Sequence, residues 1–152
     1  MPTLIAAERP DTEDATTLIG ELDGYLEPLY PQESRHGFRV EQLLREAVAF
    51  FVMRHDGMPA GCGGVKLFGT AYGEIKRMYV RPRLRGLGLG KLMLHHFADY
   101  AQQQGVAVLR LETGMYQPEA IGLYERCGFR RIPPFGAYQE DPLSLFYEKR
   151  LT

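Results

Sequence analysis

Residues 78–91, "MYVRPRLRGLGLGK", place three glycines at alternate positions after the end of an apolar strand pattern. Glycine loses more conformational entropy on folding than any other residue, so this density indicates a backbone that must approach another group closely. The residues that follow repeat an apolar side chain every fourth position, which predicts a helix to about Gln104. Free N–H groups and the dipole at a helix start favour an anion, most often a phosphate. Arg83, Arg85 and Lys91 add positive charge, so we expect an anion site here, with a tight packing turn as the alternative.

Two common nucleotide motifs do not match this stretch. A mononucleotide P-loop places Ser or Thr after its lysine, but Lys91 is followed by Leu92. The dinucleotide pattern Gly-x-Gly-x-x-Gly requires a third glycine where this chain has Lys91 or Met93. The stretch therefore predicts a phosphate ligand of another kind.

The rest of the chain alternates strand and helix patterns without a repeat or a linker. Predicted strands cover 3–9, 49–54, 58–68, 72–80, 106–112, 129–132 and 144–151, and predicted helices cover 11–27, 40–47, the segment after the glycines and 118–127. Asp11 or Thr12 is the expected cap of the first helix. The "HDG" turn at 55–57 predicts a hairpin, and the strand–helix–strand step after the glycines implies a parallel pair with a right-handed crossover. We therefore predict an α/β (α+β) fold with a mixed sheet of about seven strands, a three-stranded antiparallel meander and four main helices.

Length and composition limit the function classes. The chain has 152 residues and a formal net charge of −1, which fits a single domain over 1–152 and disfavours a general nucleic-acid binder. Its two cysteines, Cys62 and Cys127, do not form a disulfide framework. The start, "MPTLIAAERPD", lacks the basic region of a secretion signal, and no apolar segment approaches membrane-spanning length. We expect a cytoplasmic protein without a membrane partner.

Two motifs carry a resemblance to a known family. The residues "RGLGLG" (85–90), after a strand that ends in "MYVRP", resemble the acetyl-CoA signature Gln/Arg-x-x-Gly-x-Gly/Ala of the GNAT superfamily. The later "LYERCGF" (123–129) resembles its second signature, a helix followed by Gly-Phe. The predicted order of elements matches this fold over essentially the whole chain. The resemblance implies an acetyl-CoA-dependent N-acetyltransferase that acts by direct transfer in a ternary complex, without a metal.

The resemblance also implies where the cofactor binds. The backbone amides of the glycine stretch would hold the CoA pyrophosphate, and the end of the fourth strand would pair with the pantetheine amides like an added strand. This addition requires the fourth and fifth strands to splay apart. The expected cofactor residues are Met78, Tyr79, Val80, Arg85, Gly86, Leu87, Gly88, Leu89, Gly90 and Lys91.

Three residues are candidates for the chemistry. The family commonly places a tyrosine near the CoA sulfur, which makes Tyr124 the candidate acid, with a packing residue as the alternative. Glu74 is a candidate base, because a regular strand places Glu74, Lys76, Met78 and Val80 on one face. Its alternative is an ion pair with Lys76 or Arg77. Glu112 is the second candidate base, with a cap or an ion pair near Arg110 as the alternative.

Two loops, 25–38 and 132–144, are expected to frame the acceptor site. Both are rich in aromatic and acidic residues, which suit a cationic amine, and they provide the candidate substrate-binding residues Tyr30, Glu33 and Tyr138. Arg35 and His36 would instead suit a carboxylate of the acceptor, as in an amino acid or a peptide substrate. Adjacent His95 and His96 point about 100° apart on a helix and do not form a metal site. We expect a small-molecule amine or amino-acid-like acceptor. Many members of the family that the chain resembles are dimers, so a homodimer is an option. A protein or peptide N-acetyltransferase and a CoA-binding regulatory module remain the alternatives.

Overall fold

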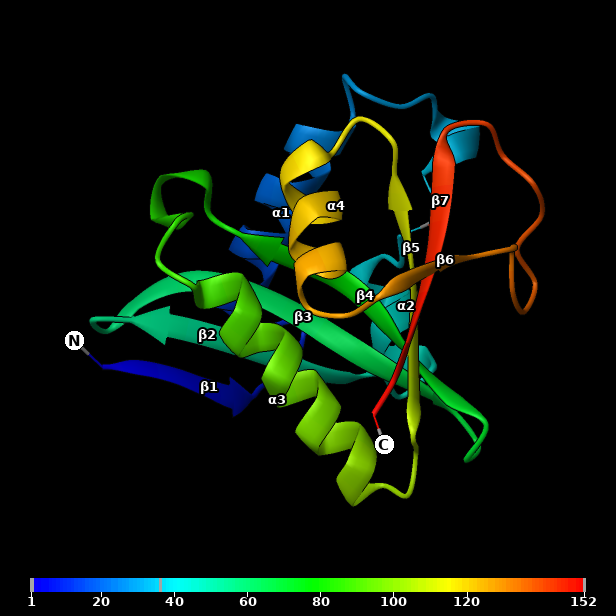
Figure 1. Ribbon diagram of the computed structural model, residues 1–152. Helices are drawn as coiled ribbons and strands as arrows, with labels where there is room; N and C mark the ends of the chain where they lie inside the picture. Colours follow the sequence, from blue (N-terminus) through cyan, green and yellow to red (C-terminus); the bar gives the residue numbers. More distant parts are fainter. Residues whose placement is uncertain (1, 36, 152) are drawn as a thin grey trace.

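A computed structural model describes residues 2–35 and 37–151, and its core is one seven-stranded sheet (Figure 1). The strand order is β1-β2-β3-β4-β5-β7-β6, and only β4 and β5 run parallel. The strands are β1 Thr3–Ala7, β2 Ala49–His55, β3 Met58–Phe68, β4 Tyr72–Val80, β5 Val108–Gly114, β6 Arg130–Ile132 and β7 Ser144–Arg150. The predicted mixed sheet, the antiparallel β2–β3–β4 meander and the parallel step are confirmed.

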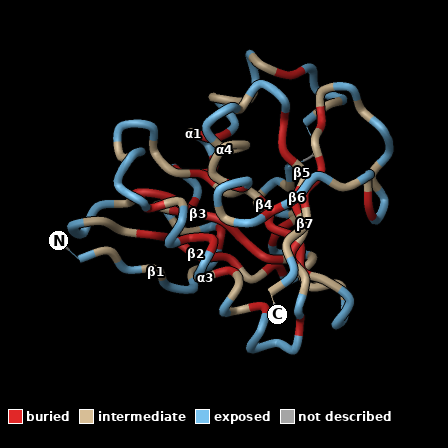
Figure 2. Tube along the Cα trace, in the orientation of Figure 1, coloured by how far each residue is buried: buried red, intermediate tan, exposed pale blue. Residues whose placement is uncertain are grey.

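Helices cover both faces of the sheet. Figure 1 shows α3 and α4 in front of the sheet and α1 and α2 behind it. The described residues form four α-helices, α1 Glu13–Leu26, α2 Val40–Arg45, α3 Leu89–Gln103 and α4 Pro118–Arg126, and two short 3-10 helices, Gln32–Ser34 and Pro82–Leu84. Buried residues gather into one cluster under α3 and α4 and a second under α1 and α2, and Figure 2 shows this buried centre inside exposed loops. The sheet therefore has a hydrophobic core on each face, as its apolar strands require.

Local sequence signals explain where α1 and α3 begin and end. The hydroxyl of Thr12 accepts a hydrogen bond from the Ala15 N–H at 3.2 Å, so Thr12 caps α1, while Asp11 pairs with Arg9. Gly88, with φ of 78°, turns the chain into α3. Gly105, also with φ of 78°, follows the helix end, where a left-handed residue is favourable.

The parallel pair β4 and β5 is short and then splits. Only Gly73 with Leu109 and Glu74 with Arg110 pair across these strands. Beyond this point the two ribbons diverge toward their carboxyl ends, with α4 in front of the gap (Figure 1). The second half of β4 therefore lacks β5 as a hydrogen-bonding neighbour, which is the splay that the sequence analysis predicted.

A bulge in β4 corrects the predicted arrangement of its side chains. Tyr79 lies opposite Cys62, and Lys76 lies opposite Gly64. The two residues of β4 are three positions apart, whereas the two residues of β3 are only two positions apart. The extra residue sits at Arg77, which has an unusual φ of 57°. Because one inserted residue moves every later side chain to the opposite face, the prediction that Glu74, Lys76, Met78 and Val80 share a face is wrong.

The bulge divides β4 between the two sides of the sheet. Met78 and Val80 join Ile75 in the cluster under α3 and α4. On the other side, Lys76 lies over the Phe38 ring, and Arg77 donates to Asp23 of α1 at 2.5 Å. The strand thus presents apolar groups to the face covered by α3 and α4 and charged groups to the other face.

Candidate functional site

The larger of two joined cavities lies between the end of β4, the glycine loop, α1 and α4, and has a volume of about 620 Å³. Its wall contains nearly all the predicted cofactor residues: Met78, Tyr79, Val80, Arg85, Gly86, Gly88, Leu89, Gly90 and Lys91. Leu87, also predicted, is not in the wall and is 57% exposed. Sequence reasoning missed Ala120, Leu123 and Cys127, which line the cleft from α4 and its end. We call this cavity the cofactor cleft.

The three glycines of the loop have different structural tasks. Gly86 and Gly88 have φ of 87° and 78°, and a Cβ on either would lie in open space. They are therefore required for the path of the backbone, because L side chains rarely adopt this conformation. Gly90 has ordinary φ, but a Cβ there would lie 2.6 Å from Leu123 Cδ2. It lets α3 approach α4, so the packing alternative is correct for this one glycine.

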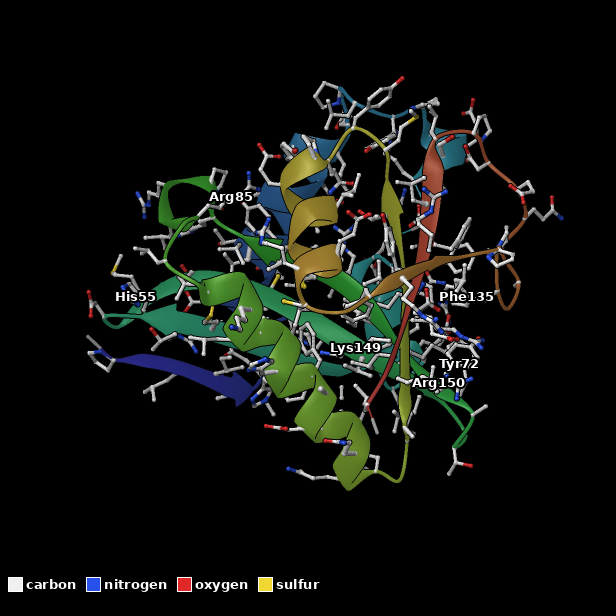
Figure 3. All side chains as sticks on the ribbon, in the orientation of Figure 1. His55, Tyr72, Arg85, Phe135, Lys149 and Arg150 are labelled. Carbon is white, nitrogen blue, oxygen red and sulfur yellow. The ribbon has the colours of Figure 1, made fainter. Side chains whose placement is uncertain are left out.

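Positive charge and free amides accompany the loop. The hydrogen bond from Leu92 N–H to Gly88 O, at 3.2 Å, is at the first turn of α3, so the N–H groups before it have no intrahelical acceptor. Arg85 and Lys91 stand beside them in the cleft wall. Arg85 lies on the loop between β4 and α3, on the opposite side of the molecule from Tyr72 and Phe135 (Figure 3). This arrangement suits a phosphorylated ligand.

The second cavity, of about 90 Å³, lies where β4 and β5 separate. We call it the acceptor pocket, after the acceptor site that the sequence analysis expects between the loops 25–38 and 132–144. Its volume holds several water-sized groups. Residues from α1, the following loop, β4, β5, α4 and the β6–β7 loop line it, including the predicted Tyr30, Glu112, Tyr124 and Tyr138. Glu33 is exposed on the short turn Gln32–Ser34 and does not line it, whereas its neighbours Ser34 and Arg35 do. His36 lies outside the described residues.

Tyr124 stands where the two cavities meet. Tyr124, Met78, Leu22 and Gln117 line both. The Tyr124 hydroxyl points to the Met78 sulfur at 3.9 Å, a weak contact that leaves its proton available. Burial and, secondarily, the charge of Glu112 raise the pKa of Tyr124 above its ordinary value of 10. The hydroxyl is therefore protonated at neutral pH.

Glu74 belongs to a buried triangle behind the pocket wall. Its carboxylate lies 3.0 Å from Lys76 Nζ and accepts a hydrogen bond from the Tyr138 hydroxyl at 2.5 Å. Lys76 donates to the same hydroxyl at 2.9 Å. Lys76 and Tyr138 line the acceptor pocket, whereas Glu74 does not. The ion pair with Lys76, given above as the alternative for Glu74, is thus present.

Glu112 is the carboxylate that reaches the acceptor pocket from β5. The Ser144 hydroxyl donates to its Oε2 at 2.8 Å. Its charge acts on Tyr30, Tyr124 and Tyr138, because it contributes to the raised pKa of each. Arg110, named above in the alternative for Glu112, donates to Glu148 of β7 at 2.9 Å.

A polar cluster at the end of β5 shapes the pocket and was missed by sequence reasoning. The Gln117 side-chain oxygen accepts from the Gly114 N–H at 3.1 Å and from the Tyr30 hydroxyl at 3.3 Å. The Tyr30 hydroxyl accepts from the Tyr116 N–H at 2.9 Å. A Cβ on Gly114 would lie 1.9 Å from the Tyr30 oxygen, so only glycine fits. In the sequence, "ETG" (112–114) indicates the end of a strand and Pro118 the start of a helix. No local sequence signal indicates that Tyr30 contacts the residues between them.

A sheet that splays between two joined cavities, with a glycine loop at the head of a helix, defines the architecture of an acyltransferase that uses a phosphorylated carrier. Residues 14–129 match the Acetyltransferase (GNAT) family, and the chain belongs to this family of acyltransferases. The described residues contain no helix long and apolar enough to cross a membrane. Within residues 2–35 and 37–151, no group of three or more His, Cys, Asp or Glu is arranged to hold a metal ion.

Similar proteins agree with this assignment. The IAA acetyltransferase of Azospirillum brasilense is 44% identical over 99% of this chain and 100% of its own. A Klebsiella pneumoniae protein, provisionally described as an acyl-CoA N-acyltransferase, is 34% identical, with a TM-score of 0.84 over 99% of this chain and 98% of its own. The PaiA N-acetyltransferase of Thermoplasma acidophilum, solved in complex with coenzyme A, shares the fold at 20% identity, with a TM-score of 0.75 over 99% of each chain.

Proposed function

We propose that this protein moves an acetyl group from acetyl-CoA to the primary amine of a small or amino-acid-like acceptor. The observation that carries the proposal is the junction of the two cavities at Tyr124, between a cleft lined by backbone amides and a pocket lined by side chains. An Azospirillum relative is called an acetyltransferase, and a neighbour in fold was solved with coenzyme A. Both support the choice of acetyl-CoA.

The cofactor cleft has the properties that coenzyme A requires. The amides from Gly86 to Lys91 would hold the pyrophosphate, and open space at the Cβ positions of Gly86 and Gly88 leaves room for close approach. The free edge of β4 at Met78–Val80 would pair with the pantetheine amides as an added strand does. When bound, acetyl-CoA supplies the activated acetyl thioester.

Tyr124 is the proposed acid. Its proton is held at neutral pH, and its hydroxyl has only a weak contact with the Met78 sulfur. A proton donor at this place would neutralise the thiolate that leaves when the acetyl group is transferred. Backbone N–H groups near Val80 would polarise the thioester carbonyl.

Glu112 is the proposed base, directly or through water. Its carboxylate lines the acceptor pocket and acts electrostatically on Tyr124, so an amine between the two side chains would have an acceptor for its proton. Glu74 remains the alternative base, and its triangle with Lys76 and Tyr138 would then have to open.

The proposal includes direct transfer. Four residues line both cavities, so the cofactor and the acceptor would contact the same side chains: Leu22, Met78, Gln117 and Tyr124. Steady-state rates of thiol release with varied acetyl-CoA and amine test it. Intersecting double-reciprocal lines are expected, whereas parallel lines would indicate an acetylated enzyme. If acetyl-CoA binds and no amine causes thiol release, the protein is a regulatory CoA-binding module.

Location and assembly belong to the same proposal. We expect a cytoplasmic enzyme, and a homodimer is the alternative to a monomer. Sedimentation at micromolar concentration separates the two assemblies.

A further inference from the structure

The charged groups of the acceptor pocket are unevenly distributed. Among the described residues, its wall contains three cations, Arg35, Lys76 and Arg77, but one carboxylate, Glu112. Which ligand such a small pocket favours depends on which of these cations are already paired within the protein.

Two of these cations are already neutralised within the protein. Lys76 and Arg77, whose side chains are 7% and 5% exposed, pair with Glu74 and Asp23. Burial of an ion without a counterion is costly, so these pairs are expected to persist when a ligand binds. Both residues then act mainly as part of the wall.

Arg35 differs from the other two cations. It forms no ion pair or side-chain hydrogen bond with another residue in the described part of the chain, and it is exposed where the α1–α2 loop meets the pocket. The loop around it contributes Ser34 and Gly37 to the same wall. A guanidinium at a pocket rim can bind a carboxylate through two parallel N–H···O bonds.

Tyr124 and Arg35 occupy different parts of the wall of the acceptor pocket. Tyr124 marks the end where the pocket joins the cofactor cleft, and the charge of Glu112 acts on it. Arg35, by contrast, lines only the acceptor pocket. Glu112 and Arg35, which have opposite charge, therefore line one small pocket, and this suits an acceptor that has both an amine and a carboxylate.

We propose that the acceptor carries a carboxylate besides its amine, as a free amino acid does, and that Arg35 binds this carboxylate and sets the specificity. This inference rests on the proposed acetyltransferase function and narrows its acceptor. Uncharged amines would lack a partner for Arg35, and a peptide would present its carboxylate at a variable distance from its reacting amine. A small free amino acid has a group for Arg35 and a group for Glu112.

The test is a thiol-release assay with a panel of small L-amino acids, each compared with its amide and with the matching amine that has no carboxylate. We expect at least one free amino acid to be acetylated at least about tenfold more efficiently than its amide, the effect of one charge-assisted contact. Arg35→Gln should raise the KM for that amino acid about tenfold, change kcat little, and leave the amide unaffected. Arg39→Gln, an exposed arginine of the same loop outside the pocket wall, is the matched control and should behave as the wild type.

Each outcome decides between proposals. Equal use of amino acids and amides, or an unchanged KM in Arg35→Gln, overturns the role of the carboxylate and leaves the acetyltransferase function intact. Thiol release with amines but with no amino acid overturns it equally. Calorimetry with acetyl-CoA alone separates these results from failure of the proposed function, since a chain that binds no acetyl-CoA would show no heat.

Discussion

The cofactor cleft and the acceptor pocket share one wall but are built from different chemical groups. The cleft presents main-chain amides of one continuous loop and the free edge of one strand, and its glycines determine where that backbone can go. The pocket presents side chains from segments scattered between Leu22 and Tyr138. A site built from backbone groups depends on the identity of few residues, whereas a site built from side chains depends on the identity of each one. Related chains can therefore keep the same acyl donor and differ in their acceptor.

The largest expected effect comes from the backbone of the cleft. Gly88→Val should weaken acetyl-CoA binding by about 300-fold, since a β-branched residue is strained at φ of 78° and the loop must rearrange. Calorimetric titration measures it. Gly69→Val is the matched control, because Gly69 also has positive φ, 57°, with open space at its Cβ, but lies in the β3–β4 turn. Equal weakening in both variants would contradict a local role.

On the pocket side, Glu74→Gln should act on stability rather than on chemistry. It leaves the Lys76 ammonium buried without its counterion, which is expected to lower the free energy of unfolding by about 3 kcal/mol. Urea unfolding measures this, and kcat of the folded variant should stay within about threefold of the wild type. Normal stability with a large loss of kcat would make Glu74 the base.

Tyr124 lies where the two cavities meet, and its substitution tests its proposed role as the acid. Tyr124→Phe should lower kcat about 100-fold while acetyl-CoA affinity stays nearly constant, because only the proton donor is removed. Since burial raises the pKa of Tyr124 above 10, the wild-type kcat should not fall from loss of this proton below pH 10. Tyr147→Phe removes a buried hydroxyl that bonds Glu125 outside both cavities and is the control. Equal kcat in the wild type and Tyr124→Phe would remove the acid role.

A smaller loss of turnover is expected at Glu112. Glu112→Gln keeps the shape and can still accept from Ser144, but it takes up no proton, so kcat should fall about tenfold if water can partly replace it. Stopped-flow or steady-state thiol release measures the change. An unaltered kcat would leave solvent or Glu74 as the base.

The smallest effect is expected at Tyr138, which closes the triangle behind the pocket. Tyr138→Phe removes its hydrogen bond to Glu74 and should lower stability by about 1 kcal/mol, or about 2–4 °C in Tm. Burial and the charge of Glu74 raise the pKa of Tyr138, so the native state keeps this proton after the unfolded chain loses it. The contribution is present below pH 10 and is lost above it, so the variant should be less sensitive to alkali. If the free energy of unfolding falls equally steeply above pH 10 in the wild type and in Tyr138→Phe, this explanation is wrong.

The same contrast explains what could be predicted from the sequence. The glycine spacing and Tyr124 lie in contiguous motifs, so the part of the cleft wall formed by the end of β4, the glycine loop and Tyr124 was predicted, whereas the part formed by α1 and most of α4 was not. The bulge at Arg77 could not be predicted, because it follows from the pairing of β4 with β3 and moves Met78 away from the face of Glu74. The contacts of Tyr30 with Gln117 and of Tyr138 with Glu74 join residues 87 and 64 positions apart. Such contacts arise only when the sheet has formed.

Calorimetric titration of the purified protein with acetyl-CoA, alongside ATP and NAD, tests the central claim most directly. The account predicts one acetyl-CoA bound per chain, with an affinity well above that for either nucleotide, since the cleft has both a pyrophosphate loop and a free strand edge for the pantetheine arm. An absence of binding, or tighter binding of ATP or NAD, would contradict it.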